Sequence, residues 1–489
     1  MGQSDRRDAR GLVRQAAAST IGSLFRARSA LMPGRIALDD GRREVRYAEL
    51  NERANQAAAV LAGLGVVRGD RVALLSENRI EYFELELAAA KLGAILACQN
   101  WRLAPPELCH CIDLVEPKVV ITSPRHRDLL AAAGIADGPI NLELGTEFEA
   151  RMADADPAEP IIAAEPEDGL FILYTSGTTG LPKGAVLSHR AEIARFVVLR
   201  ADFGLAPDDP CVGWMPLFHM GGTEPALAAL LSGGKVFVVD GFDPARLAEI
   251  IATERLGWLV LMPGMIEPLI AEIKRRDVKP KGVKLCGVMP DLVPAHQIAE
   301  LTRLLDAPYA NTFGATETGT PPCSSATIPV GEVPTRLSKW PSSCCEIRLV
   351  DRDGRDVPEG EPGELAMRGP TLFSGYWRAE ATNLEDFRDG WFHMGDMFRR
   401  NPDGSLDFVD RVKYMIKSGG ENIYPAEIER VLLADPRVAD AVVVKCKDAK
   451  WGEVPVAFVA PDDDRLTASD LHALCRQHLA GYKQPKEIR

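Results

Sequence analysis

Short continuous apolar runs alternate with helically spaced apolar residues along much of the chain. One helical set consists of Leu50, Ala54, Ala58 and Leu61. A continuous run follows at residues 72–75, and residues 119–121 repeat this strand pattern. The richest apolar window, residues 87–98, is interrupted by Lys91 and predicts a core helix. Continuous rather than alternating strand patterns are typical of sheets covered on both faces, so we expect an α/β fold.

A segment from about residue 131 to residue 169 separates this first unit from a second one. It is acidic, contains several prolines and shows little periodicity, so we expect an exposed connection. Alternation then resumes, with strands expected at residues 235–239, 259–261 and 283–286, and helices from residue 190, at 244–251 and at 265–274. The N-terminal region is therefore expected to contain two covered α/β sheet units.

The last third of the chain has a different pattern. Short β-like pieces within residues 346–368 are separated by glycine-containing turns, which predicts a small β-barrel-like subdomain. Beyond a charged joint, a helix is expected at 426–433, strands at 441–444 and 454–459, and then a helix capped by Thr467 with Asp470. We expect a large domain at residues 1–410 and a small α+β domain at residues 411–489.

Composition narrows the classes of function. The chain has 489 residues, 46% hydrophobic and 26% charged, as in a multidomain globular protein. Its net charge of −13 argues against nucleic acid or an anionic membrane as the main partner. No apolar window has the length of a membrane span, and the 10 scattered cysteines are expected to be reduced thiols in a cytoplasmic protein. Neither cysteines nor histidines show the spacing of a transition-metal site.

The most informative stretch is Tyr174-Thr175-Ser176-Gly177-Thr178-Thr179-Gly180-Leu181-Pro182-Lys183-Gly184. Glycines let backbone N–H groups turn toward one point, hydroxyls add donors, and Lys183 adds positive charge, so the stretch has the parts of a phosphate cradle. It is not the P-loop of nucleotide hydrolases, because Lys183 follows Pro182 and precedes Gly184. A flexible surface turn is the alternative interpretation.

Three further stretches carry candidate chemistry. In Asn311-Thr312-Phe313-Gly314-Ala315-Thr316-Glu317, the Phe313 ring can stack on adenine, Thr316 can donate to a phosphate and Glu317 offers a hard oxygen to Mg²⁺. Asp396 follows Gly395 and can accept both hydroxyls of a ribose. His219 follows Phe218, and a neutral imidazole there can rotate at little cost. Taken alone, His219 would be an ordinary core or surface histidine and Glu317 a solvated turn residue.

Together these stretches resemble, in order, the motifs of the adenylate-forming superfamily, which contains acyl- and aryl-CoA ligases, firefly luciferase and the adenylation domains of peptide synthetases. Bacterial acyl-CoA ligases are the most similar group, and the resemblance covers nearly the whole chain. Gly375-Tyr376-Trp377 matches a motif that is mostly structural.

The resemblance implies that Thr175 and Glu317 share the magnesium ion and that His219 lies where the carboxylate pocket meets the thiol channel. It implies ATP binding by Thr175, Ser176, Gly177, Thr178, Thr179, Gly180, Lys183, Val288, Met289, Pro290, Asn311, Thr312, Phe313, Gly314, Ala315, Thr316, Asp396 and Arg411.

The stretch at residues 410–425 resembles the hinge and the start of the mobile C-terminal domain of this superfamily. Lys413 occupies the pivot position, and rotation about it would exchange an adenylating pose for a thioester-forming pose. The residues implied to bind CoA are Ser418, Gly419, Gly420 and Trp451. The residues implied to be catalytic are Thr175, Lys183, His219, Glu317, Arg411 and Lys417.

Two departures from the family pattern affect these expectations. Gly287-Val288-Met289-Pro290 stands where the family has Gly-Gly-Ala-Pro, so the adenine wall is bulkier and is expected to shape the acid pocket as well. The family's last motif carries a lysine that bridges carboxylate and phosphate, and we expect it in a tail beyond Arg489. As given, the chain is expected to be poor at the first half-reaction, because that lysine stabilises transition-state charge.

The sequence therefore predicts an ATP-dependent carboxylic acid–CoA ligase that forms an acyl-adenylate and uses ATP, Mg²⁺ and CoA. Small and apolar residues expected around the acid pocket favour a monocarboxylate with an aliphatic or aryl body. An enzyme that loads a separate carrier protein and a non-catalytic acyl-nucleotide binding protein are the alternatives. A homodimer is possible, and no nucleic-acid partner or integral membrane segment is expected.

Overall fold

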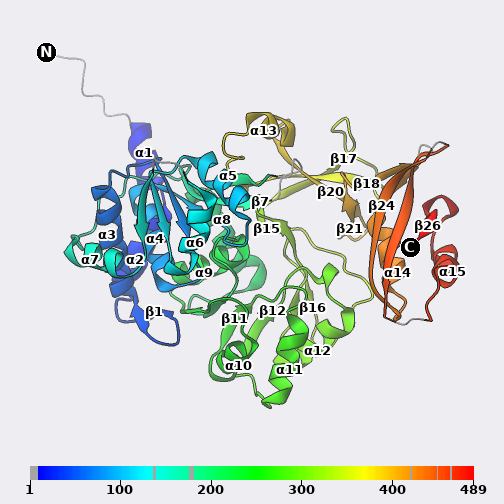
Figure 1. Cartoon of the computed structure of the whole chain (residues 1–489), viewed down its shortest axis with the longest axis horizontal. Helices are drawn as coiled ribbons and strands as arrows, with labels where there is room; N and C mark the ends of the chain where they lie inside the picture. The colour runs from blue at the N-terminus through cyan, green and yellow to red at the C-terminus, as the bar shows by residue number, and fades with distance from the viewer. Residues whose placement is uncertain (1–8, 136–138, 176–180, 419–420, 449, 463–464) are drawn as a thin grey trace. The chain divides into compact units, whose positions relative to one another are not determined.

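The computed structural model describes residues 9–135, 139–175, 181–418, 421–448, 450–462 and 465–489. Its contacts divide the chain into two compact units, whose helices and strands are labelled in Figure 1. The first unit comprises Met1–Leu337, Pro341–Cys345 and Gly369–Glu385, and the second comprises Ser338–Trp340, Glu346–Arg368 and Asp386–Arg489. No helix among the described residues combines the length and apolarity needed to cross a membrane.

The first unit contains a six-stranded sheet whose strands β7 and β8 precede and follow the predicted phosphate loop in the chain. Its strand order is β6-β5-β3-β4-β7-β8, and all neighbours are parallel except β7 and β8. The strands are β3 (Arg71–Leu75), β4 (Ile95–Cys98), β5 (Val119–Thr122), β6 (Ile140–Glu143), β7 (Gly169–Thr175) and β8 (Lys183–Ser188). The intervening helices are α3 (Tyr47–Gly63), α4 (Ile80–Leu92), α5 (Pro105–Val115), η1 (Pro124–His126), α6 (Arg127–Ala133) and α7 (Thr146–Asp154). Buried apolar strands joined by helices confirm the predicted α/β class.

Two local predictions in this region were wrong. Residues 87–98 are not one core helix, because Gly93 adopts a left-handed φ of 70° and ends α4 before β4 begins. Periodicity alone does not distinguish a short buried strand from the continuation of a buried helix. The acidic segment is also more than an exposed connection, since it contains β6 and α7, and α7 buries Phe148 and Met152.

Two four-stranded sheets complete the α/β part of the first unit. Their orders are β2-β1-β10-β9 and β11-β12-β13-β16. The strands are β1 (Ile36–Asp39), β2 (Glu44–Arg46), β9 (Cys211–Gly213), β10 (Val236–Val238), β11 (Leu256–Leu259), β12 (Val283–Cys286), β13 (Tyr309–Ala310) and β16 (Thr327–Ile328). Helices of the first unit are α1 (Ala9–Ala17), α2 (Ile21–Leu31), α8 (His189–Phe203), α9 (Met220–Ser232), α10 (Pro244–Thr253), α11 (Ile266–Arg275), η2 (Pro290–Leu292) and α12 (Ala295–Leu305), and α13 (Glu380–Asp386) ends at its boundary.

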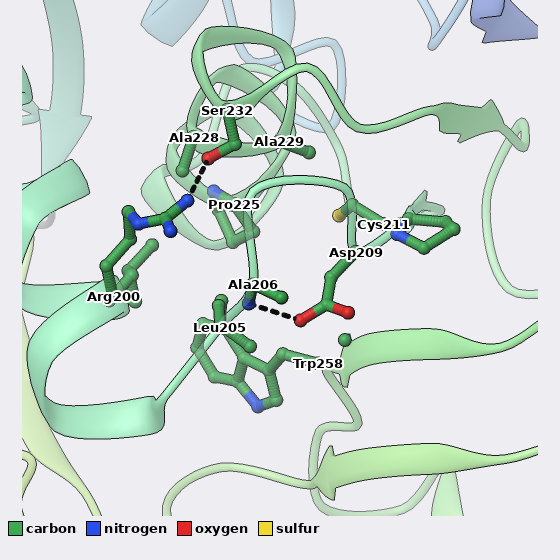
Figure 2. A pocket seen from close by; sticks show the side chains of 13 residues that line it. Arg200, Leu205, Ala206, Asp209, Cys211, Pro225, Ala228, Ala229, Ser232 and Trp258 are labelled. Carbon is green, nitrogen blue, oxygen red and sulfur yellow. Dashed lines mark hydrogen bonds between the residues drawn. The ribbon is translucent and has the colours of Figure 1, made fainter.

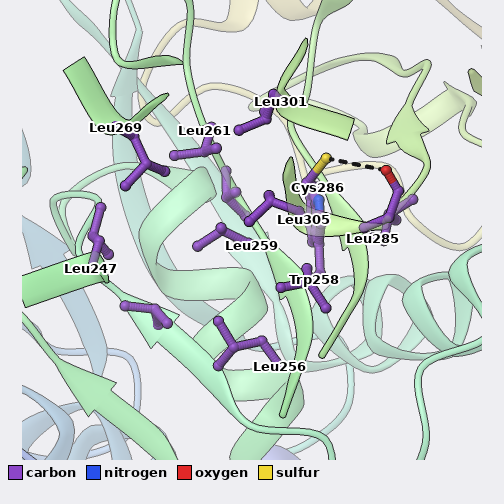
Figure 3. Close-up of a cluster of buried hydrophobic side chains, with 14 of the residues drawn as sticks. Leu247, Leu256, Trp258, Leu259, Leu261, Leu269, Leu285, Cys286, Leu301 and Leu305 are labelled. Atoms are coloured by element: carbon purple, nitrogen blue, oxygen red, sulfur yellow. Dashed lines mark hydrogen bonds between the residues drawn. The ribbon is translucent and has the colours of Figure 1, made fainter. Parts of the chain in front are cut away.

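The core behind the predicted nucleotide site is formed by the sheet that contains β11 and β12. Figure 3 shows leucines from these strands against leucines from α10, α11 and α12. Trp258 is buried among them, and its indole N–H donates a 2.9 Å hydrogen bond to Gly287 O. This core therefore anchors the loop at residues 287–290, which was predicted to contact adenine.

The second unit contains two sheets. Residues 346–368, which were expected to form a β-barrel-like subdomain, supply β17 and β18 of a five-stranded antiparallel sheet of order β17-β18-β20-β19, with β21 beside β20. Its strands are β17 (Glu346–Val350), β18 (Pro362–Arg368), β19 (Phe387–Arg388), β20 (Trp391–Arg400) and β21 (Leu406–Arg411). This sheet carries Asp396 and Arg411 on neighbouring strands.

The other sheet of the second unit has the order β23-β22-β25-β24, with β26 beside β25. Its elements are β22 (Ile416–Ser418), β23 (Glu421–Ile423), α14 (Pro425–Leu433), β24 (Val438–Asp448), β25 (Gly452–Pro461), α15 (Ala468–His478), η3 (Gly481–Lys483) and β26 (Glu487–Ile488). Ile428 and Leu432 of α14 and Leu471 of α15 pack into one core with the strands. Thr467 and Asp470 form the predicted capping box of α15, so the predicted α+β character of this region is confirmed.

Candidate active site

The hairpin of β7 and β8 carries both ends of the predicted phosphate loop. Antiparallel pairing sets Thr175 of β7 directly opposite Lys183 of β8. The intervening residues predicted to bind ATP, namely Ser176, Gly177, Thr178, Thr179 and Gly180, lie outside the described residues. The hairpin therefore places a hydroxyl-bearing and an ammonium-bearing residue as neighbours where the loop begins and ends.

Tyr376 links this hairpin to the predicted metal-binding motif. The Nζ atom of Lys183 lies 5.0 Å from the centre of the Tyr376 ring, within the range of a cation–π interaction. The Tyr376 hydroxyl donates a 2.7 Å hydrogen bond to Glu317 Oε1. Lys183 and Glu317 are thus connected through one ring. From its motif, Tyr376 was expected to be structural. Its contact with Glu317 joins residues far apart in the chain and leaves no local sequence pattern.

The predicted nucleotide motif lies in a two-stranded hairpin of β14 (Phe313–Ala315) and β15 (Gly319–Cys323). A Cβ atom on Gly314 would lie 2.0 Å from Gly319 O, so this strand pairing requires glycine. Asn311 and Thr312 are buried and support the hairpin, whereas Phe313, Ala315, Thr316 and Glu317 are partly exposed. The groups expected to meet base, phosphate and metal are therefore accessible to a ligand.

The predicted adenine wall lies beside this hairpin. Met289 N donates a 3.4 Å hydrogen bond to Thr312 Oγ1, and the Tyr309 hydroxyl donates a 2.9 Å bond to Val288 O. Met289 adopts a φ of +49°, which is uncommon for a residue with a side chain. The structure thus brings together residues 288–290 and residues 311–312, two segments that were predicted separately to bind ATP.

His219 caps the N-terminus of α9. Its Nδ1 accepts a 3.1 Å hydrogen bond from Gly221 N, so the neutral ring carries its proton on Nε2. Desolvation, followed by the positive charge of Arg102, lowers the pKa of His219 below its usual value. Neighbouring Phe218 is buried and meets Trp101 edge to face at 5.8 Å. His219 is therefore a neutral imidazole beside an aromatic wall, and its gating role stays a prediction.

In the second unit, Asp396 and Arg411 form the predicted ribose and nucleotide pair. They are opposite each other on β20 and β21, and Arg411 Nε lies 3.1 Å from Asp396 Oδ1. Asp396 is 3% exposed, whereas the Arg411 side chain is 51% exposed. A buried carboxylate beside an exposed guanidinium can bind a polar ligand from one side.

The residues predicted for the hinge and for CoA binding lie on or beside β22. Ser418 is the strand partner of Gly452, which places it next to Trp451, and the Trp451 side chain is exposed. Gly419 and Gly420 lie outside the described residues. Lys413 and Lys417 line an open cleft of about 530 Å³, whose other lining residues are Arg352, Val412, Met415, Lys445 and Glu453. The second unit therefore presents positive charge beside the predicted CoA residues.

The donors at the motif of Glu317 fit a magnesium–nucleotide complex. Within the part of the chain that the structure describes, no group of three or more His, Cys, Asp or Glu side chains could hold a metal ion by itself. Magnesium needs only one or two protein oxygens when phosphates and water complete its shell. Glu317 is partly exposed and offers a carboxylate, and Thr175 offers a hydroxyl. These residues suit a metal that arrives with its nucleotide.

A separate pocket in the first unit is not part of this site. Figure 2 shows Arg200 bound to Ser232 Oγ at 3.1 Å and Asp209 accepting a 2.6 Å hydrogen bond from Ala206 N. Lys284 also contacts Asp209 at 2.6 Å. The charged groups of the pocket are therefore already paired, and none of the predicted site residues lines it.

Comparison with known families identifies this combination of motifs. A family model described as an AMP-binding enzyme matches residues 25–377, and a model of the AMP-binding enzyme C-terminal domain matches residues 427–489. The chain belongs to the AMP-binding enzyme family. This membership confirms the adenylate-forming superfamily that the motifs predicted, and with it the use of ATP.

Relatives in the AMP-binding family extend the match to whole chains. A feruloyl-CoA synthase from Amycolatopsis is 35% identical over 96% of this chain and 94% of its own length. An indoleacetate–CoA ligase from Aromatoleum aromaticum is 36% identical over 94% of this chain and 92% of its own length. Both names state acid–CoA ligation, the predicted reaction class.

Solved structures of the AMP-binding family share the fold. The structure of ATP-bound MatB from Rhodopseudomonas palustris matches with a TM-score of 0.83, 27% identity, and coverage of 96% of this chain and 94% of that chain. The o-succinylbenzoate CoA synthetase of Bacillus subtilis, in complex with its acyl-adenylate, matches with a TM-score of 0.82, 28% identity and the same coverage. These matches confirm the predicted fold class.

Proposed function

We propose that this chain is an AMP-forming carboxylic acid–CoA ligase whose substrate is a monocarboxylate with an apolar, aryl body. The acid carboxylate attacks the α-phosphorus of ATP and releases pyrophosphate, and the CoA thiol then displaces AMP from the acyl-adenylate. The protein supplies positioning and charge neutralisation rather than a nucleophile. An aryl body is supported by the relatives, which are named for feruloyl, indoleacetate and 2-succinylbenzoate substrates.

The observation that carries this proposal is that Lys183 Nζ lies over the Tyr376 ring while Glu317 accepts a hydrogen bond from the hydroxyl of the same residue. Lys183 and the loop hold the β- and γ-phosphates, which become the leaving pyrophosphate. Glu317 and Thr175 would hold Mg²⁺, which would supply neutralisation of phosphate charge. Phe313 stacks on adenine, and Thr316 donates to the α-phosphate.

The second unit completes the proposed reaction. Asp396 accepts the ribose hydroxyls, and Arg411 contacts the nucleotide. Lys413 is the hinge between residues 1–410 and 411–489, and Ser418 and Trp451 belong to the CoA site, with Lys417 as a charge near the reacting groups. His219 gates the junction of acid pocket and thiol channel. The homodimer and the cytoplasmic location stay predictions.

A screen of carboxylic acids for ATP–pyrophosphate exchange tests the function, with mass detection of the CoA thioester as the second step. We expect aryl monocarboxylates to drive exchange and to give a thioester of matching mass. If no acid in a broad panel drives exchange, the ligase proposal fails. Exchange without any CoA product would instead support transfer to a carrier protein.

A further inference from the structure

The guanidinium of Arg195 lies inside the first unit, although nothing in the local sequence marks it. Arg195 is on α8 and is 1% exposed. Its Nη1 contacts Glu224 Oε1 of α9 at 2.5 Å and lies 3.7 Å from Glu192 Oε1. A buried charge of this kind is costly unless it is both paired and hydrogen-bonded. Its other two nitrogens must therefore have defined acceptors.

Those acceptors are two backbone carbonyls close to Glu317. Nη2 of Arg195 donates to Thr316 O at 3.0 Å, and Nε donates to Thr371 O at 2.9 Å. Thr316 immediately precedes Glu317, and Thr371 begins the segment that leads to Phe373 and Tyr376. The planar side chain of Arg195 is thus hydrogen-bonded both to the segment that contains Thr316 and to the segment that begins at Thr371, and the two segments meet at the Glu317 carboxylate.

The segment that begins at Thr371 closes around Glu317 from the other side. Phe373 N donates a 2.9 Å hydrogen bond to Glu317 O, and the Tyr376 hydroxyl binds Glu317 Oε1. The space beside Arg195 is filled, since a Cβ atom on Gly319 would lie 2.9 Å from its side chain. A shift of Arg195 would therefore move the carbonyl before Glu317 and the segment that holds its carboxylate.

We propose that Arg195 is a positioning residue for Glu317, fixing that carboxylate in the direction from which it meets the metal–nucleotide substrate. The inference rests on the proposed function of Glu317. The fork-shaped guanidinium is essential, because it donates to Glu224 and to two backbone carbonyls in three different directions. The ammonium group of a lysine cannot reach all three acceptors with that geometry. Glu224 balances the charge of Arg195.

Two variants separate positioning from stability. Arg195→Lys keeps the charge opposite Glu224 but loses the fork, and Arg195→Met combined with Glu224→Gln removes both charges of the buried pair. We expect either protein to fold and to lose about 10- to 100-fold in the adenylation kcat, since a displacement of about 1 Å is enough for such a loss. Arg200→Lys is the matched control on α8, because Arg200 binds Ser232 rather than the motif backbone. Wild-type kcat in both Arg195 variants would overturn the proposal.

Backbone hydrogen exchange without any substrate gives a second readout that does not depend on the reaction. We expect faster exchange in peptides covering residues 313–323 and 369–377 of the Arg195 variants, and unchanged exchange in residues 425–461. Unchanged exchange at both motif segments would overturn the proposal even if activity fell. If the wild type drives no ATP–pyrophosphate exchange with any acid, but the Arg195 variants show faster hydrogen exchange at both motif segments, the positioning role stands. Only the proposed ligase function is then refuted.

Discussion

The candidate site is held rigidly in the first unit and loosely in the second. Around Glu317, the Thr316 carbonyl accepts a hydrogen bond from Arg195 and the Glu317 carbonyl accepts one from Phe373 N. The Glu317 carboxylate accepts one from the Tyr376 hydroxyl. In the second unit, the hydrogen bonds at Lys413 and Lys417 involve mainly their backbone, with Lys445 Nζ at 3.4 Å from Lys413 O and Lys417 N donating to Glu453 at 2.9 Å. The Trp451 side chain is 47% exposed.

This difference fits two kinds of task. Charge stabilisation at a reacting phosphate requires groups that are already in place, because reorganisation during the reaction costs rate. Long exposed side chains suit a region that meets its ligand only after a domain movement. We therefore expect substitutions at the motif of Glu317 to reduce rates strongly, and substitutions at the hinge to change the balance between the two half-reactions.

The largest effect is expected for Glu317→Gln. The amide keeps the shape of the side chain but removes the charge that would hold Mg²⁺, so the rate of adenylation should fall by about 10²- to 10³-fold. Acid-dependent ATP–pyrophosphate exchange over a range of Mg²⁺ concentrations measures this. Glu332→Gln, at an exposed position, is the control. Equal rates in the Glu317→Gln variant and the wild type would contradict the metal role.

A smaller effect is expected for Tyr376→Phe. The ring beneath Lys183 remains, but the 2.7 Å hydrogen bond to Glu317 is lost, and hydrogen bonds to charged groups contribute about 1.5–3 kcal/mol. Adenylation should therefore slow by about 10-fold or somewhat more. The same exchange assay applies, with exposed Tyr482→Phe as the control. A fully active variant would mean that Tyr376 acts only through its ring.

Sequence patterns predicted most of the elements, because an element that is buried on one side repeats apolar residues at the period of a strand or a helix, as in β12 and α10. They failed where one apolar window crossed a helix end, at Gly93. They also missed Tyr376 and Arg195. Tyr376 meets a carboxylate 59 residues away, and Arg195 looks like an ordinary charge on an amphipathic helix until tertiary packing buries it. Residues that act through distant partners leave no local pattern.

Lys413→Pro tests the loosely held region. Proline fixes φ at the proposed pivot, so thioester formation should slow by about 3- to 10-fold while adenylation changes less. The two half-reactions are measured separately, by pyrophosphate exchange and by CoA-dependent consumption of preformed acyl-adenylate. Lys413→Ala removes the side chain but keeps backbone freedom and serves as the control. Equal losses in both half-reactions would argue against a pivot at this residue.

The smallest effect is expected at the buried acids behind the motif of Glu317. Desolvation, followed by the charge of Glu224, raises the pKa of Glu192 above its usual 4.5, and Arg195 opposes this. Between pH 4.5 and the raised pKa, the folded state keeps a proton that the unfolded state has lost, so stability falls as pH rises through this window. Burial, followed by the charge of Glu192, also raises the pKa of Glu86 above its usual value.

Glu192→Gln should remove the part of this pH dependence that comes from Glu192. The amide cannot ionise, so the variant should gain roughly 1–2 °C in Tm over wild type near pH 8, the shift expected for about 1 kcal/mol in a unit of this size, and nothing near pH 4.5. Thermal unfolding across this range measures the difference, with exposed Glu49→Gln as the control. Parallel pH profiles for the Glu192→Gln variant and the wild type would show that Glu192 is ionised in the folded state. The Arg195 guanidinium would then be shared between two carboxylates, and its hold on the Thr316 carbonyl would depend on both.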